Sequence, residues 1–354
     1  MAPELDQGRV DAFGERMLGI INSAGLGYDL SIGHRTGLFD TMAELPPSTS
    51  VEIAQAAGLH ERYVREWLNG LTVGRIVDYD PGPGRYWLPP EHAAFLTHAA
   101  GPDNLAFQAQ YLAMFGGVED AIVDCFRNGG GVPYSEFPAF QALMAEESGA
   151  AFDAALVDGV LPIVPGLVDR LREGIDVADV GCGQGHAVNV MAAAFPNSRF
   201  SGLDFSNDGV AAGRAEAAQL GLSNADFQVA DIAGLAGAFD LVTGFDIVHD
   251  QAKPRQVLEA IRASLRPGGL FLCADIAGSS LVHENMEHPI GPWLYTTSLL
   301  HCMTVSLAQD GEGLGTMWGE QVALTYFADA GFRVEDPVHV DGDPINVYYV
   351  CRPM

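Results

Sequence analysis

The fold of this 354-residue chain is decided by one stretch, Val177-Ala178-Asp179-Val180-Gly181-Cys182-Gly183-Gln184-Gly185. It reads as a buried strand that enters a glycine-rich turn, and a helical pattern follows at once. Acidic residues, Asp204 and Asp231, end the next two strand-like segments. This layout is typical of a nucleotide pocket at the carboxyl edge of a parallel sheet. The spacing is G-x-G-x-G, whereas dinucleotide-binding turns read G-x-G-x-x-G, so the pattern points instead to S-adenosylmethionine.

Downstream of this stretch, strand and helix patterns alternate, which predicts strand–helix–strand units and a parallel sheet. The expected strands are 177–181, 199–204, 226–230, 239–245, 270–275, 333–338 and 346–351. The expected helices are 186–195, 208–220, 254–265 and 319–330. A long insertion, rich in histidine, methionine and aromatic residues, lies between Ile276 and Gly319. Because it follows the carboxyl end of a strand, it is placed to cover a ligand.

Upstream, the patterns predict three helical segments and a β-hairpin, which together indicate a winged helix-turn-helix. The helical segments are 11–45, 51–57 and 61–71, and the hairpin is 76–88. Gly25 and Gly27 are expected to interrupt the first segment, and Ser48 or Ser50 to cap the second. Residues 92–170 are mainly helical in pattern and could supply one wall of a substrate pocket.

A winged helix raises the possibility of DNA binding, which requires several basic contacts to phosphates. The first hundred residues hold seven arginines against thirteen acidic residues, and the formal net charge of the chain is -28. Nucleic acid is therefore an unfavourable partner, and a role in dimerisation or as a substrate lid is favoured. The five cysteines show no CxxC spacing, and no apolar run is long enough to cross a membrane. We expect a cytoplasmic protein without a membrane segment.

Several short segments carry a family resemblance. They are Asp-Val-Gly-Cys-Gly-Gln-Gly at 179–185, Asp204, Asp231, Phe-Asp-Leu-Val at 239–242, Leu-Arg-Pro-Gly-Gly at 265–269, Gly331-Phe332 and Asn346-Val347-Tyr348. Residues 179–354 thereby resemble a class I S-adenosylmethionine-dependent methyltransferase. With the winged helix, the whole chain resembles small-molecule methyltransferases that dimerise through such a domain. These include plant and bacterial O-methyltransferases, and in particular mycobacterial and actinobacterial members.

The resemblance implies an α/β fold, in which a Rossmann-like domain with a mostly parallel seven-stranded sheet follows a mainly helical winged-helix domain. We expect a winged-helix and dimerisation domain at 1–100 and a helical linker that contributes to the substrate pocket at 101–172. The S-adenosylmethionine-binding catalytic domain is expected at 173–354, with a lid-like insertion at 277–319.

Each expected cofactor residue has a chemical reason. Glycines let the backbone approach a ligand closely, and an aspartate at the end of the second strand can accept both ribose hydroxyls. Asp179 can orient the turn or face the ammonium group, Asp231 can accept from the adenine amine, and Phe205 and Ile232 can sandwich the ring. The full set is Asp179, Gly181, Cys182, Gly183, Gly185, Asp204, Phe205, Asp231, Ile232, Phe245 and Asp246.

A hydroxyl or amine acceptor must lose a proton, so a histidine or carboxylate near the methyl group is expected. His249, after the fourth strand, is one candidate base, and His301 in the insertion is another; His283 and His288 remain alternatives. Aromatic and methionine side chains in the insertion predict an apolar, aromatic acceptor. These pocket residues are Trp293, Tyr295, Met303 and Trp318. No cluster of oxygen ligands is evident, so a metal-dependent enzyme is disfavoured.

We therefore expect a homodimeric methyltransferase that transfers a methyl group to an oxygen or nitrogen atom of a small apolar molecule. The alternative is a transcriptional regulator that uses the winged helix on DNA and the second domain as a sensor. A third possibility is a protein of this fold that binds the cofactor but catalyses another reaction.

Overall fold

The computed structural model describes residues 5–340, 343 and 345–354. The chain divides into two compact units, Met1–Gly117 and Val118–Met354, which are described separately here. The boundary between them falls inside the segment that the sequence predicts as a helical linker. Among the described residues, no single helix is long and apolar enough to cross a membrane, although one bent pair, 140–163 with 167–173, passes that test by length and composition.

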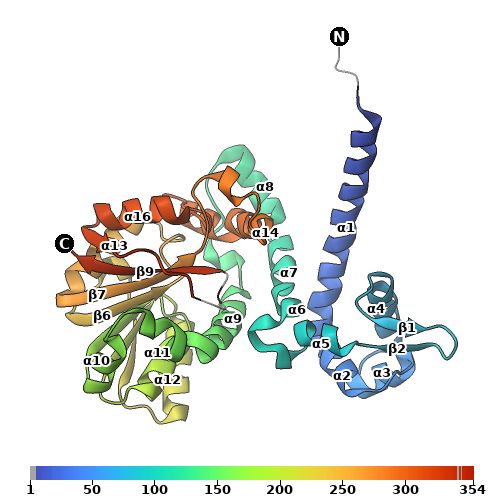
Figure 1. The fold of residues 1–354 in the computed structure, drawn as a ribbon, viewed down its shortest axis with the longest axis horizontal. Coiled ribbons are helices and arrows are strands. Elements are labelled where there is room, and N and C mark those ends of the chain that lie inside the picture. The colour runs from blue at the N-terminus through green and yellow to red at the C-terminus, as the bar shows by residue number, and fades with distance from the viewer. Residues whose placement is uncertain (1–4, 341–342, 344) are drawn as a thin grey trace. The chain divides into compact units, whose positions relative to one another are not determined.

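The first unit is a helical winged-helix domain (Figure 1). Its elements are α1 (Gln7–Thr36), α2 (Leu38–Glu44), α3 (Ser50–Ala57), α4 (Glu61–Val73), β1 (Asp78–Asp80), β2 (Arg85–Trp87), α5 (Pro90–Leu96), η1 (His98–Asp103), α6 (Leu105–Gln108) and α7 (Gln110–Gly116). The wing is the antiparallel hairpin β1–β2. An apolar core that includes Phe39, Trp67 and Leu68 joins the helices to the hairpin.

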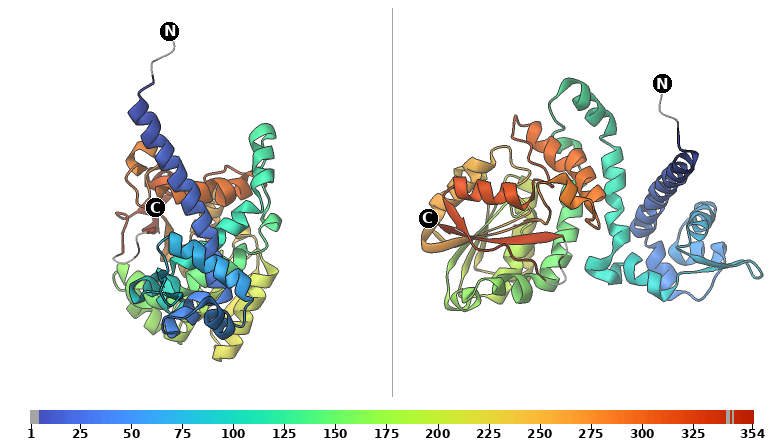
Figure 2. Two further views of the ribbon diagram at one scale, coloured as in Figure 1. Left: turned by 90° about the vertical axis from the view of Figure 1, so that its right-hand side faces the viewer. Right: turned by 45° about the horizontal axis from the view of Figure 1, so that its top comes forward.

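Two local predictions were wrong in this unit. Helix α1 continues through Gly25 and Gly27, and both views in Figure 2 show it unbroken. A helix tolerates a glycine at a cost of about 1 kcal/mol, and Gly27 has a packing reason, because a Cβ there would lie 2.4 Å from Leu112 Cδ1. The cap of α3 is Thr49, not either neighbouring serine; its hydroxyl accepts from the Glu52 N–H in a reciprocal capping box.

The second unit contains the predicted α/β domain and the helices before it. The helices before the sheet are α8 (Glu119–Asn128), η2 (Tyr134–Glu136), α9 (Phe140–Ala155), η3 (Leu156–Val160), η4 (Leu161–Ile163) and α10 (Leu167–Glu173). The strands are β3 (Asp176–Val180), β4 (Arg199–Asp204), β5 (Ala225–Val229), β6 (Phe239–Phe245), β7 (Leu265–Ile276), β8 (Phe332–Val334) and β9 (Asn346–Pro353). The remaining helices are α11 (His186–Ala194), α12 (Asn207–Leu220), η5 (Ile232–Gly234), α13 (Pro254–Ser264), η6 (Val282–Asn285), α14 (Gly291–Thr297), η7 (Ser298–Cys302), α15 (Met303–Leu307) and α16 (Gly319–Asp329).

The sheet has seven strands in the order β5-β4-β3-β6-β7-β9-β8, so the predicted fold class is confirmed. Strands β3 to β7 pair in parallel, and β9 pairs antiparallel with both β7 and β8. Helices α10, α11 and α12 cover one face, and α13 and α16 cover the other (Figure 1). After β5 the chain returns to the other side of β3, which creates a switch point between β3 and β6, where ligands bind in open sheets of this kind.

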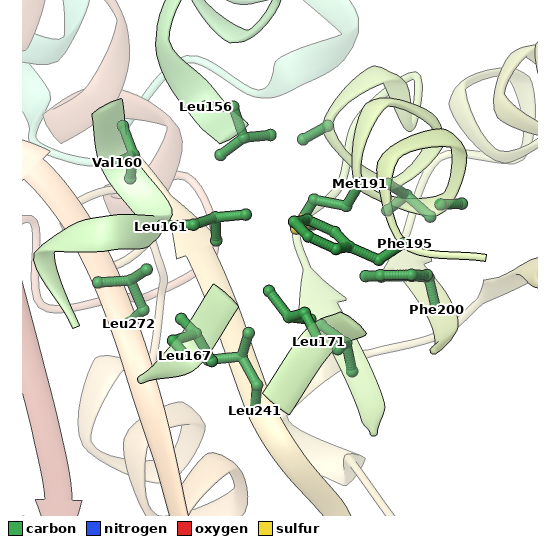
Figure 3. Close-up of a cluster of buried hydrophobic side chains, with 14 of the residues drawn as sticks. Leu156, Val160, Leu161, Leu167, Leu171, Met191, Phe195, Phe200, Leu241 and Leu272 are labelled. Carbon is green, nitrogen blue, oxygen red and sulfur yellow. The ribbon is translucent and has the colours of Figure 1, made fainter. Parts of the chain in front are cut away.

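A buried apolar cluster fixes the helices before the sheet against the face that α10, α11 and α12 cover (Figure 3). Leu156 and Leu161 approach from the segment before α10, and Leu167 and Leu171 come from α10 itself. They pack with Met191 of α11, with Phe195 directly after it, and with Phe200, Leu241 and Leu272 of the strands. Burial of each such side chain contributes about 1.5–3 kcal/mol. The segment from η3 to α10 is therefore part of the sheet domain's own core.

Candidate functional site

The glycine turn and the segment after β6 meet at the switch point. Gly181 has a φ of +69°, and a Cβ there would lie 2.6 Å from Ile247 Cγ2. Gly183 has a φ of +54°, but its Cβ position faces open space. The first glycine is therefore required by packing, whereas the second leaves room for a ligand beside the backbone. Gly185 also has a positive φ and begins α11.

Two predicted carboxylates lie next to this turn, and one of them holds it by a hydrogen bond. Asp204 accepts from Gly183 N–H at 2.9 Å and from Ser206 N–H at 2.8 Å. Burial raises the pKa of Asp204, against the effect of these hydrogen bonds. Asp179 is 3% exposed and accepts from the Thr243 hydroxyl at 2.6 Å. Burial raises the pKa of Asp179 to about 7. Much of this side chain is therefore uncharged near neutral pH, and its main role is to hold the ends of β3 and β6 together through Thr243.

The other predicted cofactor residues near β4 and β5 lie in different environments. Asp231 is exposed and caps η5 by accepting from Ala233 N–H at 2.9 Å, whereas Ile232 is buried. Phe205 is 57% exposed, so its side chain is accessible to a ligand. Cys182 is half-buried, and burial raises the pKa of its thiol, as suits a packed residue in the turn.

Asp246, directly after β6, is the most strained member of the predicted set. Its φ is +56°, which is rare for a residue other than glycine and is found most often at functional sites. Its Oδ1 is buried and has no hydrogen-bond partner among the described residues. Burial, with Asp275 nearby, raises the pKa of Asp246 to about 8. The adjacent Phe245 packs its ring 5.2 Å from the ring of Phe152 on α9.

The structure pairs His249 with a carboxylate that sequence reasoning did not select. His249 Nδ1 lies 2.7 Å from Asp275 Oδ1, and both side chains are buried. Trp318 Nε1–H donates to the same oxygen at 3.1 Å. Burial alone lowers the pKa of His249, but Asp275 and the neighbouring Cys302 raise it well above its usual range. Such a pair holds the imidazole orientation and stabilises its protonated form.

His301, the second candidate base, is fully buried among aromatic rings. It stacks on Phe140 with ring centres 3.6 Å apart and meets Phe137 and Tyr134 edge-on at 4.7 and 5.3 Å. Its Nδ1 lies 3.7 Å from Cys302 Sγ, and its Nε2 has no partner among the described residues. Burial, with His249 nearby, lowers the pKa of His301 to about 3, so its imidazole is neutral.

The same aromatic residues line an open cleft of about 450 Å³. Its walls are residues 134–142, with Gln184 of the glycine turn and Phe205 after β4. The Tyr134 hydroxyl donates to Asp250, next to His249, and its ring lies 5.4 Å from that of Phe205. The cleft therefore lies beside the glycine turn, while His249 and His301 are buried and are not part of its lining.

The wall segment is anchored at Gly131. A Cβ at this glycine would lie 2.0 Å from the Thr304 carbonyl oxygen of α15, and Val132 N–H donates to Thr304 Oγ1 at 2.8 Å. No larger residue fits where Gly131 meets α15. This contact sets the position from which Tyr134, Phe137 and Phe140 project.

The predicted pocket residues of the insertion do not form one wall. Trp318 is 5% exposed and packs against Tyr326 and Phe327 of the core, with its N–H on Asp275. Tyr295 is 38% exposed, and its hydroxyl accepts from the Asn285 amide at 3.0 Å. Trp293 and Met303 are half-buried on the same insertion.

The residues at the switch point fit a ligand with a nucleoside part and a cationic centre. Open space beside Gly183 leaves room for the ligand, and Asp204 holds the turn around it. The buried Oδ1 of Asp246 lies at this site without a hydrogen-bond partner among the described residues. Buried acids of this kind favour a positively charged group.

Comparisons with known proteins agree with this architecture. Residues 24–98 match an Rv2258c-like winged HTH domain, and residues 171–310 match a methyltransferase domain. The chain therefore joins a winged-helix domain of that type to a methyltransferase domain of the class I fold.

Curated relatives match only a part of the chain. A ubiquinone biosynthesis O-methyltransferase of Cereibacter sphaeroides is 32% identical over 107 residues, which cover 29% of this chain and 42% of that protein. A fatty-acid O-methyltransferase of Mycolicibacterium smegmatis is 31% identical over 103 residues, which cover 29% and 38%. The chain thus spans about two fifths of the length of these relatives.

Solved structures match nearly the whole chain. The mitomycin 7-O-methyltransferase MmcR superposes with a TM-score of 0.74 at 18% identity, over 98% of this chain and 100% of that one. Human N-acetylserotonin methyltransferase, in complex with SAM, gives 0.69 at 18% identity over the full length of both. At this identity the likeness shows the fold alone.

Proposed function

We propose that this protein is an S-adenosylmethionine-dependent methyltransferase that modifies an oxygen or nitrogen atom of a small, apolar, aromatic molecule. The observation that carries the proposal is the meeting, at one switch point, of the glycine turn, Asp204 and the buried pair His249–Asp275. The matched methyltransferase domain supports it. The similarity to proteins named as O-methyltransferases favours oxygen as the methylated atom.

When bound, S-adenosylmethionine supplies a methyl group already activated on a sulfonium. The chain must then bind, orient and keep out water, and orientation alone can contribute about 7–11 kcal/mol. Asp204 and the glycine turn hold the nucleoside part, and the buried carboxylate of Asp246 favours the cationic end. The aromatic residues that line the cleft, including Tyr134 and Phe140, provide apolar walls for the acceptor.

His249 is the proposed proton acceptor. The acceptor hydroxyl or amine must lose a proton, and the Asp275 carboxylate stabilises the imidazolium that results. Because its pKa is raised, His249 becomes an unprotonated base only above its ordinary pH range. The methyltransferase is therefore expected to be more active in alkaline than in acidic solution.

The proposed partner of the first unit is a second copy of the chain. Helix α1 exposes apolar side chains at one-face spacing, among them Phe13 and Ile21, which are 61% and 66% exposed. A contiguous exposed apolar stripe marks an association surface. Sedimentation velocity should show a dimer for the wild type and a monomer for Phe13→Glu/Ile21→Glu. Leu220→Glu on the second unit, which also replaces an exposed apolar residue, is the matched control and should leave the dimer intact.

The regulator alternative has less support in the structure. Both arginines of the presumed recognition helix α4 form ion pairs with glutamates one turn away, Arg62 with Glu66 and Arg65 with Glu61. DNA binding would need these cations for phosphates.

Calorimetry with S-adenosylmethionine and S-adenosylhomocysteine tests the proposal directly. Micromolar binding, about -8 kcal/mol, is expected for both. Incubation with methyl-labelled cofactor and either 1-naphthol or 1-naphthylamine then separates oxygen from nitrogen transfer by mass spectrometry. Absence of cofactor binding would refute the proposal.

A further inference from the structure

The Tyr134 side chain spans the carboxyl edge of the sheet at the glycine turn. Its hydroxyl donates to Asp250 on the segment after β6, and its ring lies 5.4 Å from that of Phe205, directly after β4. The strand order β4-β3-β6 places the end of β3, from which the glycine turn continues, between those two points. A side chain that reaches from one to the other therefore crosses the switch point, where we propose that the methyl donor binds.

Groups proposed to hold the donor are covered in this arrangement. Asp204 is 5% exposed, and Asp246 Oδ1 is buried. The Cβ position of Gly183 faces open space, and Gln184 of the same turn lines the cleft together with Tyr134. Room for a ligand thus exists beside the turn, but a ligand reaches the Asp204 carboxylate only after a covering side chain moves.

The backbone that carries Tyr134 is held at both ends. The contact of Gly131 with α15 fixes one end. At the other end the Ser206 hydroxyl donates to Gln141 Oε1 at 2.9 Å, and the Gln184 amide donates to the Gln141 carbonyl oxygen at 3.4 Å. A movement that uncovers the turn is therefore expected in a side chain and not in this backbone.

Among the three rings on this segment, that of Tyr134 is the one placed to move. Phe137 is 3% exposed, and Phe140 stacks on His301 with ring centres 3.6 Å apart. Tyr134 is half-buried, and its ring centre lies 5.3 Å from that of His301 at an edge-on angle. Its hydroxyl is held by the hydrogen bond to Asp250. Loss of that bond leaves a tyrosine side chain free to change its staggered rotamer.

We propose that the Tyr134 side chain is a gate over the methyl-donor site, held closed by its hydrogen bond to Asp250. The inference rests on the proposed function. Rotation about the Cα–Cβ bond breaks this hydrogen bond and opens the edge between Phe205 and Asp250. S-adenosylmethionine enters and S-adenosylhomocysteine leaves through the open state, and the closed state keeps water out during transfer.

A gate and a direct ligand contact have different kinetic signatures. When the gate is closed both in the free protein and in the complex, a weaker bond to Asp250 favours the open state equally in both. The association and dissociation rate constants then rise by the same factor, and Kd stays the same. Loss of a direct contact with the ligand instead raises the dissociation rate constant alone, as most changes in affinity do.

Surface plasmon resonance with immobilised full-length protein and S-adenosylhomocysteine tests the gate. Tyr134→Phe keeps the ring and removes the hydroxyl, so both rate constants should rise about 10-fold. Asp250→Ala breaks the same bond from the other side and should give the same rise, and the double variant should be no faster than either single one. Tyr326→Phe, which removes a hydroxyl that donates to Glu312, is the matched control and should change neither rate constant.

A rise in the dissociation rate constant alone would overturn the gate, because Tyr134 would then be a ligand contact. Unchanged rate constants in Tyr134→Phe would overturn it as well. Circular dichroism verifies the fold, and Asp250→Ala replaces Tyr134→Phe if that variant does not fold. No binding of S-adenosylhomocysteine to the wild type refutes the proposed function and the gate with it, whereas binding with unchanged rate constants refutes the gate alone.

Discussion

Strand β3 carries one aspartate near each end, and the two differ in their electrostatic environment. Asp176 at the amino edge binds Arg199 at 2.6 Å and Arg266 at 2.7 Å. Although burial acts in the other direction, these guanidiniums lower the pKa of Asp176. Asp179, three residues on, accepts a hydrogen bond from the Thr243 hydroxyl, and burial raises its pKa to about 7.

Strand β6 repeats the contrast. Asp240 at its amino end pairs with Arg266 at 2.5 Å, whereas Asp246 after its carboxyl end has a raised pKa. Arginine ion pairs therefore stabilise one edge of the sheet, whereas at the other edge Asp179 and Asp246 have no ion pair among the described residues and Asp275 pairs with His249. A protein retains such costly groups where a ligand or a reaction uses them, so the difference marks the functional edge without reference to any relative.

The largest expected effect is at His249. His249→Asn should lower the rate of methyl transfer by about 10²–10⁴-fold, since general-base assistance is lost. In the wild type the rate should rise with pH through a pKa above 6.5, because that of His249 is raised. Release of S-adenosylhomocysteine in the presence of the acceptor found by screening measures both. His288→Asn, in the insertion, is the control; an equal loss there would contradict the assignment.

The next effect concerns the affinity for S-adenosylhomocysteine, compared between variants at the carboxyl edge and at the amino edge of the sheet. Asp204→Asn weakens the acceptor of the Gly183 and Ser206 N–H groups, so S-adenosylhomocysteine should bind about 10–100-fold less tightly. Calorimetry at one salt concentration measures the change. Asp176→Asn, at the opposite edge, should leave the affinity unchanged, and a comparable loss there would show that both variants act through general damage to the sheet.

A smaller effect is expected on stability at the functional edge. The folded protein holds the pKa of Asp246 at about 8 against an ordinary value of 3.8, so stability falls as pH rises from about 4 through about 8. Asp246→Asn removes this decline and should raise the free energy of unfolding at pH 8 on the order of 1–3 kcal/mol. Urea unfolding at pH 5 and pH 8 measures it. Equal stability of both proteins at pH 8 would refute the raised pKa of this carboxyl group.

The smallest effect is on stability at the amino edge, where the pH dependence due to Asp176 has the opposite sign to that due to Asp246. Because the pKa of Asp176 is lowered, its ion pairs stabilise the protein above the ordinary aspartate pKa, and this stability is lost as pH falls through the lowered value. Asp176→Asn should cost about 1 kcal/mol at pH 7, as partly exposed ion pairs do. Urea unfolding at pH 7 and pH 3 should show the two proteins converging in acid; a constant difference would point to packing instead.

The sequence predicted the elements of the sheet domain closely, because strand periodicity and glycine punctuation are local signals. The predicted strand 239–245 coincides with β6, and the predicted seven strands all form. Residues at strand ends, such as Asp204, were also accessible to this reasoning, because parallel topology gathers them at one edge.

The hydrogen-bond partners of residues near the site could not be predicted from the sequence in the same way. Tyr134 reaches Asp250 across 116 positions, and Trp318 reaches Asp275 across 43, so no local spacing connects them. Cys302 was one of five scattered cysteines until the π-helical turn placed its Sγ atom 3.7 Å from His301 Nδ1. The predicted pocket role of Trp318 rested on its aromatic character, which a core position satisfies equally well.

The contact at Gly131 has a consequence for how the range of proposed methyl acceptors can change. Because the chain is pinned to α15 there, Tyr134, Phe137 and Phe140 project from a fixed platform that contributes no strand to the sheet. Exchanging these rings reshapes the cleft while the glycine turn, Asp204 and the strand register stay as they are. Substitution of these three side chains can therefore change the specificity of the proposed acceptor site and leave the residues proposed to bind the methyl donor unchanged.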